Sequence, residues 1–169
     1  MQSIKIVISY LGIFVILGLL YQYHIKYDYE PKVDPVLQTY VDEWRLDMDS
    51  AGISYSRAWD ELKSIEIVEC SKIKAGLINS NGGDEHTLGM VIKPDRRIVI
   101  DSSLLTMHES ILRMTIYHEL GHYAFNLDHI DDHEHIMNTN PLHYSEYKEK
   151  WPEFKYNYIN TILTQLNER

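Results

Sequence analysis

A long apolar run opens the chain. From Ile6 to Tyr23 it carries 18 residues without a charged side chain, and a helix of that length covers about 27 Å, close to the thickness of a bilayer core. The residues that end the run, Leu19 to Gln22, are all large, whereas a signal-peptide cleavage site needs small residues. The pattern therefore predicts residues 1–26 as an uncleaved, single-pass membrane anchor with its flanks.

After the anchor, the pattern becomes that of a folded domain. Residues 27–34 mix charges with proline, which is typical of an extended linker. Asp34 can cap a helix that has Pro35 in its first position, and apolar residues then recur at helical spacing over 36–50. We therefore expect one domain, residues 35–169, that begins with an amphipathic helix.

The next part of the chain has the pattern of strands. Residues 65–69 alternate apolar and acidic side chains, as a half-buried strand does. The runs 88–92 and 97–100 flank a turn-prone segment, Lys93 to Arg96, which predicts a β-hairpin. A small mixed sheet is expected from these three strands.

The second half of the chain returns to helical spacing. Thr106 and Glu109 stand in capping-box register ahead of an apolar face that continues to Leu120. Apolar and aromatic residues predict another helix over 145–167, with Pro152 in its first turns or at a kink. The predicted fold class is α+β, with one helix behind a small sheet and a mainly helical C-terminal part.

Composition and charge narrow the possible functions. The net charge of −9 argues against a nucleic-acid partner, because binding phosphates requires clustered lysine and arginine. The single cysteine, Cys70, cannot form an internal disulfide, and we interpret it as a buried strand residue.

The residues that carry chemistry lie on the helix that follows the hairpin. Residues 118–122 read His-Glu-Leu-Gly-His, and side chains four positions apart lie on one face of a helix, so His118 and His122 can bind one metal ion. Neutral imidazole is a preferred ligand of zinc. Glu119 lies between the two histidines, where its carboxylate can act as general base towards a zinc-activated water.

The segment from Tyr117 to Met137 resembles the active site of the metzincins, a family of zinc proteases. In that family a glycine ends the helix, a third histidine ligand follows, and a methionine turn lies beneath the metal. Here His129 falls one residue later than the family pattern places it, and Asn126 takes the helix-ending position, which suits the left-handed conformation. Ile136 and Met137 are placed similarly to the methionine turn. The resemblance implies a zincin-like fold with His129 as the third zinc ligand.

Other arrangements of the same chemistry stay open. Asp128 occupies the standard position of the third ligand and is the leading substitute for His129. In the related gluzincin arrangement a glutamate on a later helix completes the site, and Glu146 and Glu149 are the candidates. His133 and His135 lie near the predicted site, so accidental extra metal binding is expected in assays.

These observations favour a membrane-anchored, zinc-dependent endopeptidase that binds one catalytic Zn²⁺ through His118, His122 and His129. Its partners would be a peptide or protein substrate, added along the hairpin as one more strand, and the membrane. The alternative is a membrane-anchored metal-binding protein without enzymatic activity, whose zinc is structural and closed by four protein ligands.

We expect the domain to lie outside the cytoplasm, because the N-terminal run resembles an export signal. A reporter enzyme that works only in the cytoplasm, fused after Arg169 in the full-length chain, should therefore be inactive. Cytoplasmic reporter activity would contradict this orientation.

Overall fold

The computed structural model describes residues 30–69, 88–138 and 147–169. The chain divides into two compact units, Met1–Glu30 and Pro31–Arg169, and the second unit contains every element given below. The predicted anchor and Cys70 lie outside the described residues. Within the three described stretches, no helix is both long and apolar enough to cross a membrane.

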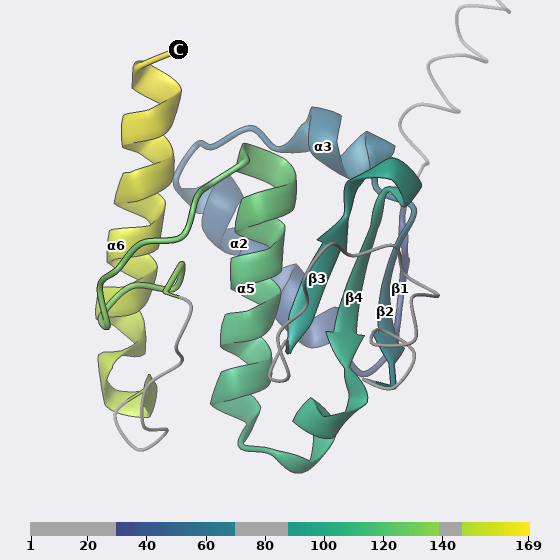
Figure 1. Ribbon diagram of the computed structural model, residues 1–169. Coiled ribbons are helices and arrows are strands. Elements are labelled where there is room, and N and C mark those ends of the chain that lie inside the picture. The colour runs from purple at the N-terminus through teal and green to yellow at the C-terminus, as the bar shows by residue number, and fades with distance from the viewer. Residues whose placement is uncertain (1–29, 70–87, 139–146) are drawn as a thin grey trace, which may run out of the picture. The chain divides into compact units, whose positions relative to one another are not determined.

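Four strands form one mixed sheet (Figure 1). In chain order they are β1 (Lys32–Val33), β2 (Ser64–Val68), β3 (Gly89–Ile92) and β4 (Arg97–Asp101). The spatial order is β1-β2-β4-β3; the first three strands in this order run parallel, and β3 lies at the edge, antiparallel to β4. The predicted hairpin is confirmed, and the sheet together with the helices confirms the α+β class.

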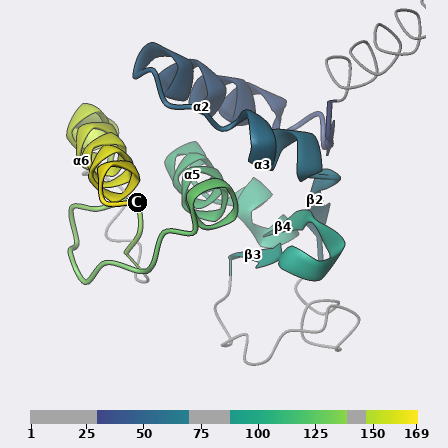
Figure 2. The ribbon, with the colours of Figure 1, turned by 90° about the horizontal axis from the view of Figure 1, so that it is seen from above.

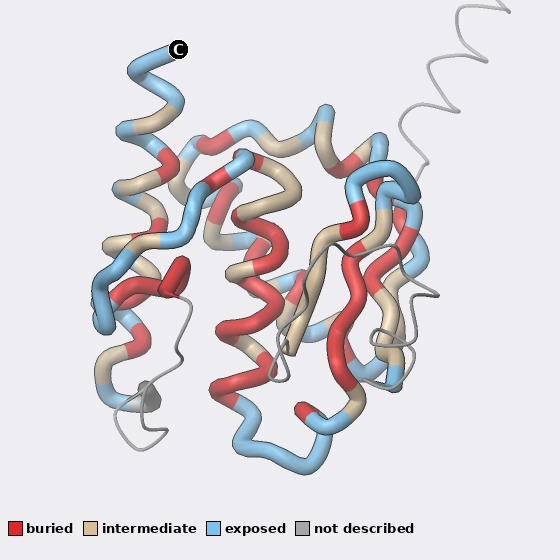
Figure 3. The backbone as a smooth tube through the Cα atoms, viewed as in Figure 1, coloured by how far each residue is buried: buried red, intermediate tan, exposed pale blue. Residues whose placement is uncertain are grey.

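One helix contacts every layer of the domain. The helices are α2 (Gln38–Ser50), α3 (Ser56–Glu61), α5 (Glu109–Phe125) and α6 (Tyr147–Asn167), with short 3-10 turns η1 (Lys93–Asp95) and η2 (Ser102–Thr106). Helix α5 packs against β3, β4, α2, α3 and α6, and Figure 2 shows it between the sheet and α6. Most of α5 is buried (Figure 3), so its polar residues are held in fixed surroundings.

One of the two caps predicted for α5 is wrong and the other is confirmed. The capping box expected from Thr106 and Glu109 is wrong: Thr106 ends η2, and the His108 side chain caps α5 by accepting a hydrogen bond from the Ser110 N–H at 3.3 Å. The other end was predicted correctly, because Asn126 adopts the left-handed conformation, with φ of 54°. That turn redirects the chain immediately after the histidine motif.

The start of the domain also differs from the sequence pattern. Asp34 does not cap α2 directly; its Oδ1 accepts from the Val36 N–H at 3.1 Å and its carbonyl from the Leu37 N–H at 2.8 Å. These bonds form a turn, and α2 begins at Gln38. Lys32 and Val33 fall in the predicted linker, residues 27–34, but they form strand β1, which pairs with β2.

Buried hydrogen bonds tie α2 and α6 to α5. Trp44 Nε1 donates to the Tyr158 hydroxyl at 3.1 Å, and this hydroxyl donates to the Tyr117 carbonyl at 2.9 Å. The Tyr117 hydroxyl in turn donates to Asp47 Oδ2 at 2.5 Å, and Lys155 Nζ donates to Asp47 Oδ1 at 2.9 Å. Burial raises the pKa of the Tyr117 hydroxyl far above its usual range, so this donor stays protonated.

The Tyr158→Phe substitution should lower the free energy of unfolding by about 1–3 kcal/mol, because it leaves the buried Trp44 N–H without an acceptor. Tyr156 on the same helix is 66% exposed and offers a matched control: Tyr156→Phe should change stability by no more than about 0.5 kcal/mol. Urea unfolding of residues 27–169 measures both. Equal effects of the two substitutions would contradict the proposed importance of the buried hydroxyl.

Candidate metal centre

Helix α5 presents His118 and His122 on one face. Their spacing of four residues places the imidazoles one turn apart, and their Nε2 atoms lie 3.0 Å from each other. Both side chains are partly buried. The pair thus forms one half of a nitrogen cluster at the C-terminal end of the helix.

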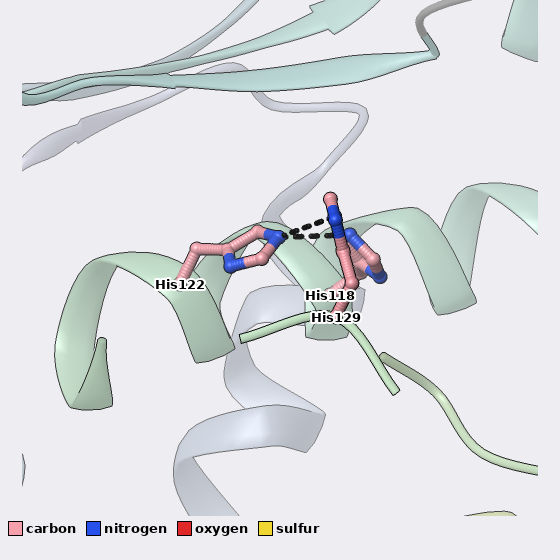
Figure 4. A group of neighbouring side chains, drawn as sticks. All are labelled: His118, His122 and His129. Carbon is pink, nitrogen blue, oxygen red and sulfur yellow. Dashed lines mark hydrogen bonds between the residues drawn. The ribbon is translucent and has the colours of Figure 1, made fainter. Parts of the chain in front are cut away.

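The third member of the cluster comes from the segment after the helix. The left-handed Asn126 turns the chain back along α5, and Lys93 Nζ from η1 donates to Asn126 Oδ1 at 2.5 Å. This turn brings His129 Nε2 to 3.0 Å from His122 Nε2 (Figure 4). The three ligand nitrogens all lie within 4.8 Å of one another, and the His129 side chain is exposed to solvent. These three histidines are close enough to bind one metal ion.

The backbone determines which nitrogen of the α5 imidazoles carries the proton. His118 Nδ1 lies 2.8 Å from the Ile136 carbonyl, and His122 Nδ1 lies 2.6 Å from the Leu127 carbonyl. A carbonyl only accepts, so each Nδ1 is the protonated atom and each Nε2 of the neutral rings carries a lone pair.

Neutral rings are also what their surroundings favour. Burial lowers the pKa of His118 to about 4, and burial likewise lowers the pKa of His122. Two unprotonated Nε2 atoms at 3.0 Å cannot hydrogen bond to each other, and a shared cation would satisfy both lone pairs. The donor set therefore fits a metal such as zinc, which binds neutral histidine nitrogen.

A close contact beneath α5 explains the glycine of the motif. A Cβ added at Gly121 would lie 2.9 Å from Met137 Sδ and 3.0 Å from the Tyr158 hydroxyl, so a larger residue would push against both. Met137 is fully buried and its carbonyl accepts from the Ile130 N–H at 3.0 Å, next to His129. The segment around Met137 therefore packs under the helix and also holds the chain that carries the third histidine.

Glu119 points towards the sheet. It is only 6% exposed, and its Oε1 lies 2.9 Å from where a Cβ on Gly89 would be. Gly89 belongs to β3, so the absence of a side chain there makes room for the carboxylate. Burial raises the pKa of Glu119 to about 8, which makes it a stronger base than an exposed glutamate.

The other sequence candidates stay outside the cluster. Asp128, Glu149 and His133 are exposed, and none belongs to the metal-binding group found within the described part of the chain. Glu146 lies outside the described residues. The structure therefore brings His129, and not Asp128 or Glu149, to the two histidines of α5.

Sequence reasoning missed the groups that support these side chains. The carbonyls of Leu127 and Ile136 carry no sequence signal, since every residue has one. Gly89 had a weak signal, because an isolated glycine in a strand often marks a close approach. No known protein family, curated protein or solved structure matches the chain, so functional inference rests on the chemistry of these residues.

We predict that the domain binds one divalent ion and that His129→Ala weakens zinc binding more than the roughly 10- to 100-fold that loss of a supporting hydrogen bond costs. Asp128→Ala and His133→Ala serve as matched controls in the same loop and should leave the affinity nearly unchanged. Competition titration with a chelating dye measures all three. An unchanged affinity in His129→Ala, or a large loss in Asp128→Ala, would reject His129 as the third ligand.

Proposed function

We propose that the chain is a zinc-dependent endopeptidase with a zincin-like site formed by His118, His122 and His129. The observation that supports the proposal is the convergence of three histidine Nε2 atoms, two from a buried helix and one from an exposed loop residue. Glu119 directly follows the first of these ligands in the sequence. Helical histidines with a glutamate beside them and an accessible third ligand are typical of zinc sites that hydrolyse peptide bonds.

Zinc would supply Lewis acidity, which polarises a carbonyl and makes water a stronger nucleophile. Glu119 is the residue of this chain assigned to the proton transfers: it takes a proton from water and passes it to the leaving amine. Its buried position favours this role, because desolvation raises the pKa of its carboxyl to about 8 and so increases its basicity. The three histidines hold the cation and do not exchange protons.

The edge strand β3 supports a peptide as the substrate. The Asp101 N–H donates to the Leu88 carbonyl at 2.8 Å, and hydrogen-bonded pairs alternate along an antiparallel ladder. The backbone groups of Gly89 and Val91 therefore point away from β4, towards the side on which no further strand lies among the described residues. A peptide could pair with this edge as an added strand and pass the helix at Glu119, which packs against Gly89.

We further propose that residues 1–26 anchor the enzyme to a membrane, with the domain outside the cytoplasm. The uncharged run Ile6 to Tyr23 supports this proposal. Main-chain pairing along β3 would give loose sequence selectivity, which suits an enzyme that acts on varied peptides near the membrane surface.

A structural zinc site is the competing function. Such a site would close its coordination with four protein ligands. X-ray absorption spectroscopy of the zinc-loaded protein distinguishes the two: three histidine ligands and one water support the endopeptidase, and four protein ligands support the structural site.

The Glu119→Gln substitution tests the proposed activity most directly. It should keep the zinc content near one ion per chain and lower kcat for peptide hydrolysis by roughly 100- to 10,000-fold, because it removes the general base and keeps its shape. Glu109→Gln, at the exposed first residue of the same helix, is the matched control and should retain full activity. Hydrolysis of a fluorogenic peptide library measures both, and undiminished turnover in Glu119→Gln would refute the assignment.

A further inference from the structure

The peptide unit between Ile136 and Met137 lies between two histidines. Its carbonyl, on Ile136, accepts a hydrogen bond from His118 Nδ1 at 2.8 Å. Its N–H, on Met137, donates to His135 Nδ1 at 3.0 Å. One rigid peptide plane therefore connects His135 to the imidazole of His118.

The hydrogen bonds determine the tautomer of His135. Because Nδ1 accepts from the Met137 N–H, the proton of the neutral ring is on Nε2. This Nε2 lies 2.9 Å from Thr161 Oγ1, and the Thr161 hydroxyl donates to the Asn157 carbonyl at 3.0 Å. Thr161 can therefore accept from His135 and donate within α6 at the same time.

Every donor in this series points in the same direction. The His118 Nδ1–H donates to the Ile136 carbonyl, and the N–H of the same peptide unit donates to His135 Nδ1. The His135 Nε2–H then donates to the Thr161 hydroxyl, which donates to the Asn157 carbonyl. Hydrogen bonds aligned in this way polarise one another, so each acceptor becomes stronger. A stronger acceptor at Nδ1–H also makes the opposite nitrogen of His118 a better metal ligand.

We propose that His135, held by Thr161 of α6, is a positioning residue that orients His118 for metal binding. The proposal rests on the metal centre described above. His135 is 5% exposed, and its two ring nitrogens contact the Met137 segment and α6. It therefore connects the C-terminal helix to His118 on α5, although His135 is not a member of the three-histidine group.

Substitutions of His135 distinguish a positioning role from a role in packing alone. If the imidazole only fills space, any substitution of similar size would act through stability alone. If it positions His118, the essential feature is the acceptor for the Met137 N–H. Asparagine places its oxygen where Nδ1 lies and accepts from the N–H two residues ahead, whereas glutamine places its polar group near Nε2.

The experiment compares His135→Asn with His135→Gln, and Thr161→Ser with Thr161→Val. We expect His135→Gln and Thr161→Val to weaken zinc binding by about 10- to 100-fold. His135→Asn should remain within about threefold of the wild type, because its short side chain accepts from the Met137 N–H in a local turn that does not need Thr161 to hold it. Thr161→Ser should also remain within about threefold, because it keeps the hydroxyl that accepts from the His135 imidazole. The absorption bands of the cobalt-substituted protein should shift in the first two variants and stay unchanged in the other two.

A second measurement is made on the metal-free protein. In ¹H–¹⁵N spectra of the imidazoles, the wild type should show a protected His118 Nδ1–H and an unprotonated His135 Nδ1. The His118 signal should be lost in His135→Gln and retained in His135→Asn. Retention in both variants would overturn the proposal, and so would equal zinc affinities of the two variants. A wild type that shows these signals but binds no zinc would instead refute the proposed function and leave the positioning role supported.

Discussion

The two hydrogen bonds from the α5 imidazoles to backbone carbonyls are the interactions on which the site depends. The carbonyls of Ile136 and Leu127 hold the Nδ1 protons of His118 and His122, and the Nε2 lone pairs must therefore face each other. Without these carbonyls the proton of either ring could lie on Nε2, which would then have no lone pair for a metal ion. The same short segments also lead into His129 and Met137, so a single stretch of backbone fixes ring orientation and supplies the remaining parts of the site.

Close packing keeps that stretch against the helix. Gly121 lets Met137 and Tyr158 approach α5, and Tyr158 also accepts from Trp44, so α2, α5 and α6 meet at one point. Gly89 has the corresponding role on the sheet side, where it leaves room for Glu119. Both glycines are needed because α5 is covered on two sides, and a larger side chain at either position would displace the residues that pack there.

The sequence predicted those elements that are long enough to show several periods of apolar spacing. Helices α2, α5 and α6 have at least thirteen residues, so apolar spacing is visible over several turns. The hairpin β3–β4 was marked by its turn residues. In contrast, α3 has six residues and β1 has two, which is too short for a period to appear. The cap of α5 was misassigned to Thr106 because sequence spacing does not reveal that η2 uses Thr106 first.

The sequence by itself determined the helical spacing of His118 and His122 and the helix stop at Asn126, because each depends on local geometry within a few residues. It offered His129 as a third ligand only through the resemblance to the metzincins, beside other candidates. Only the tertiary structure decided which candidate joins the pair, which nitrogens face the metal position and how deeply Glu119 is buried. Those properties depend on carbonyls, a glycine and a C-terminal helix that are distant in sequence or chemically unremarkable, and folding alone brings them into contact.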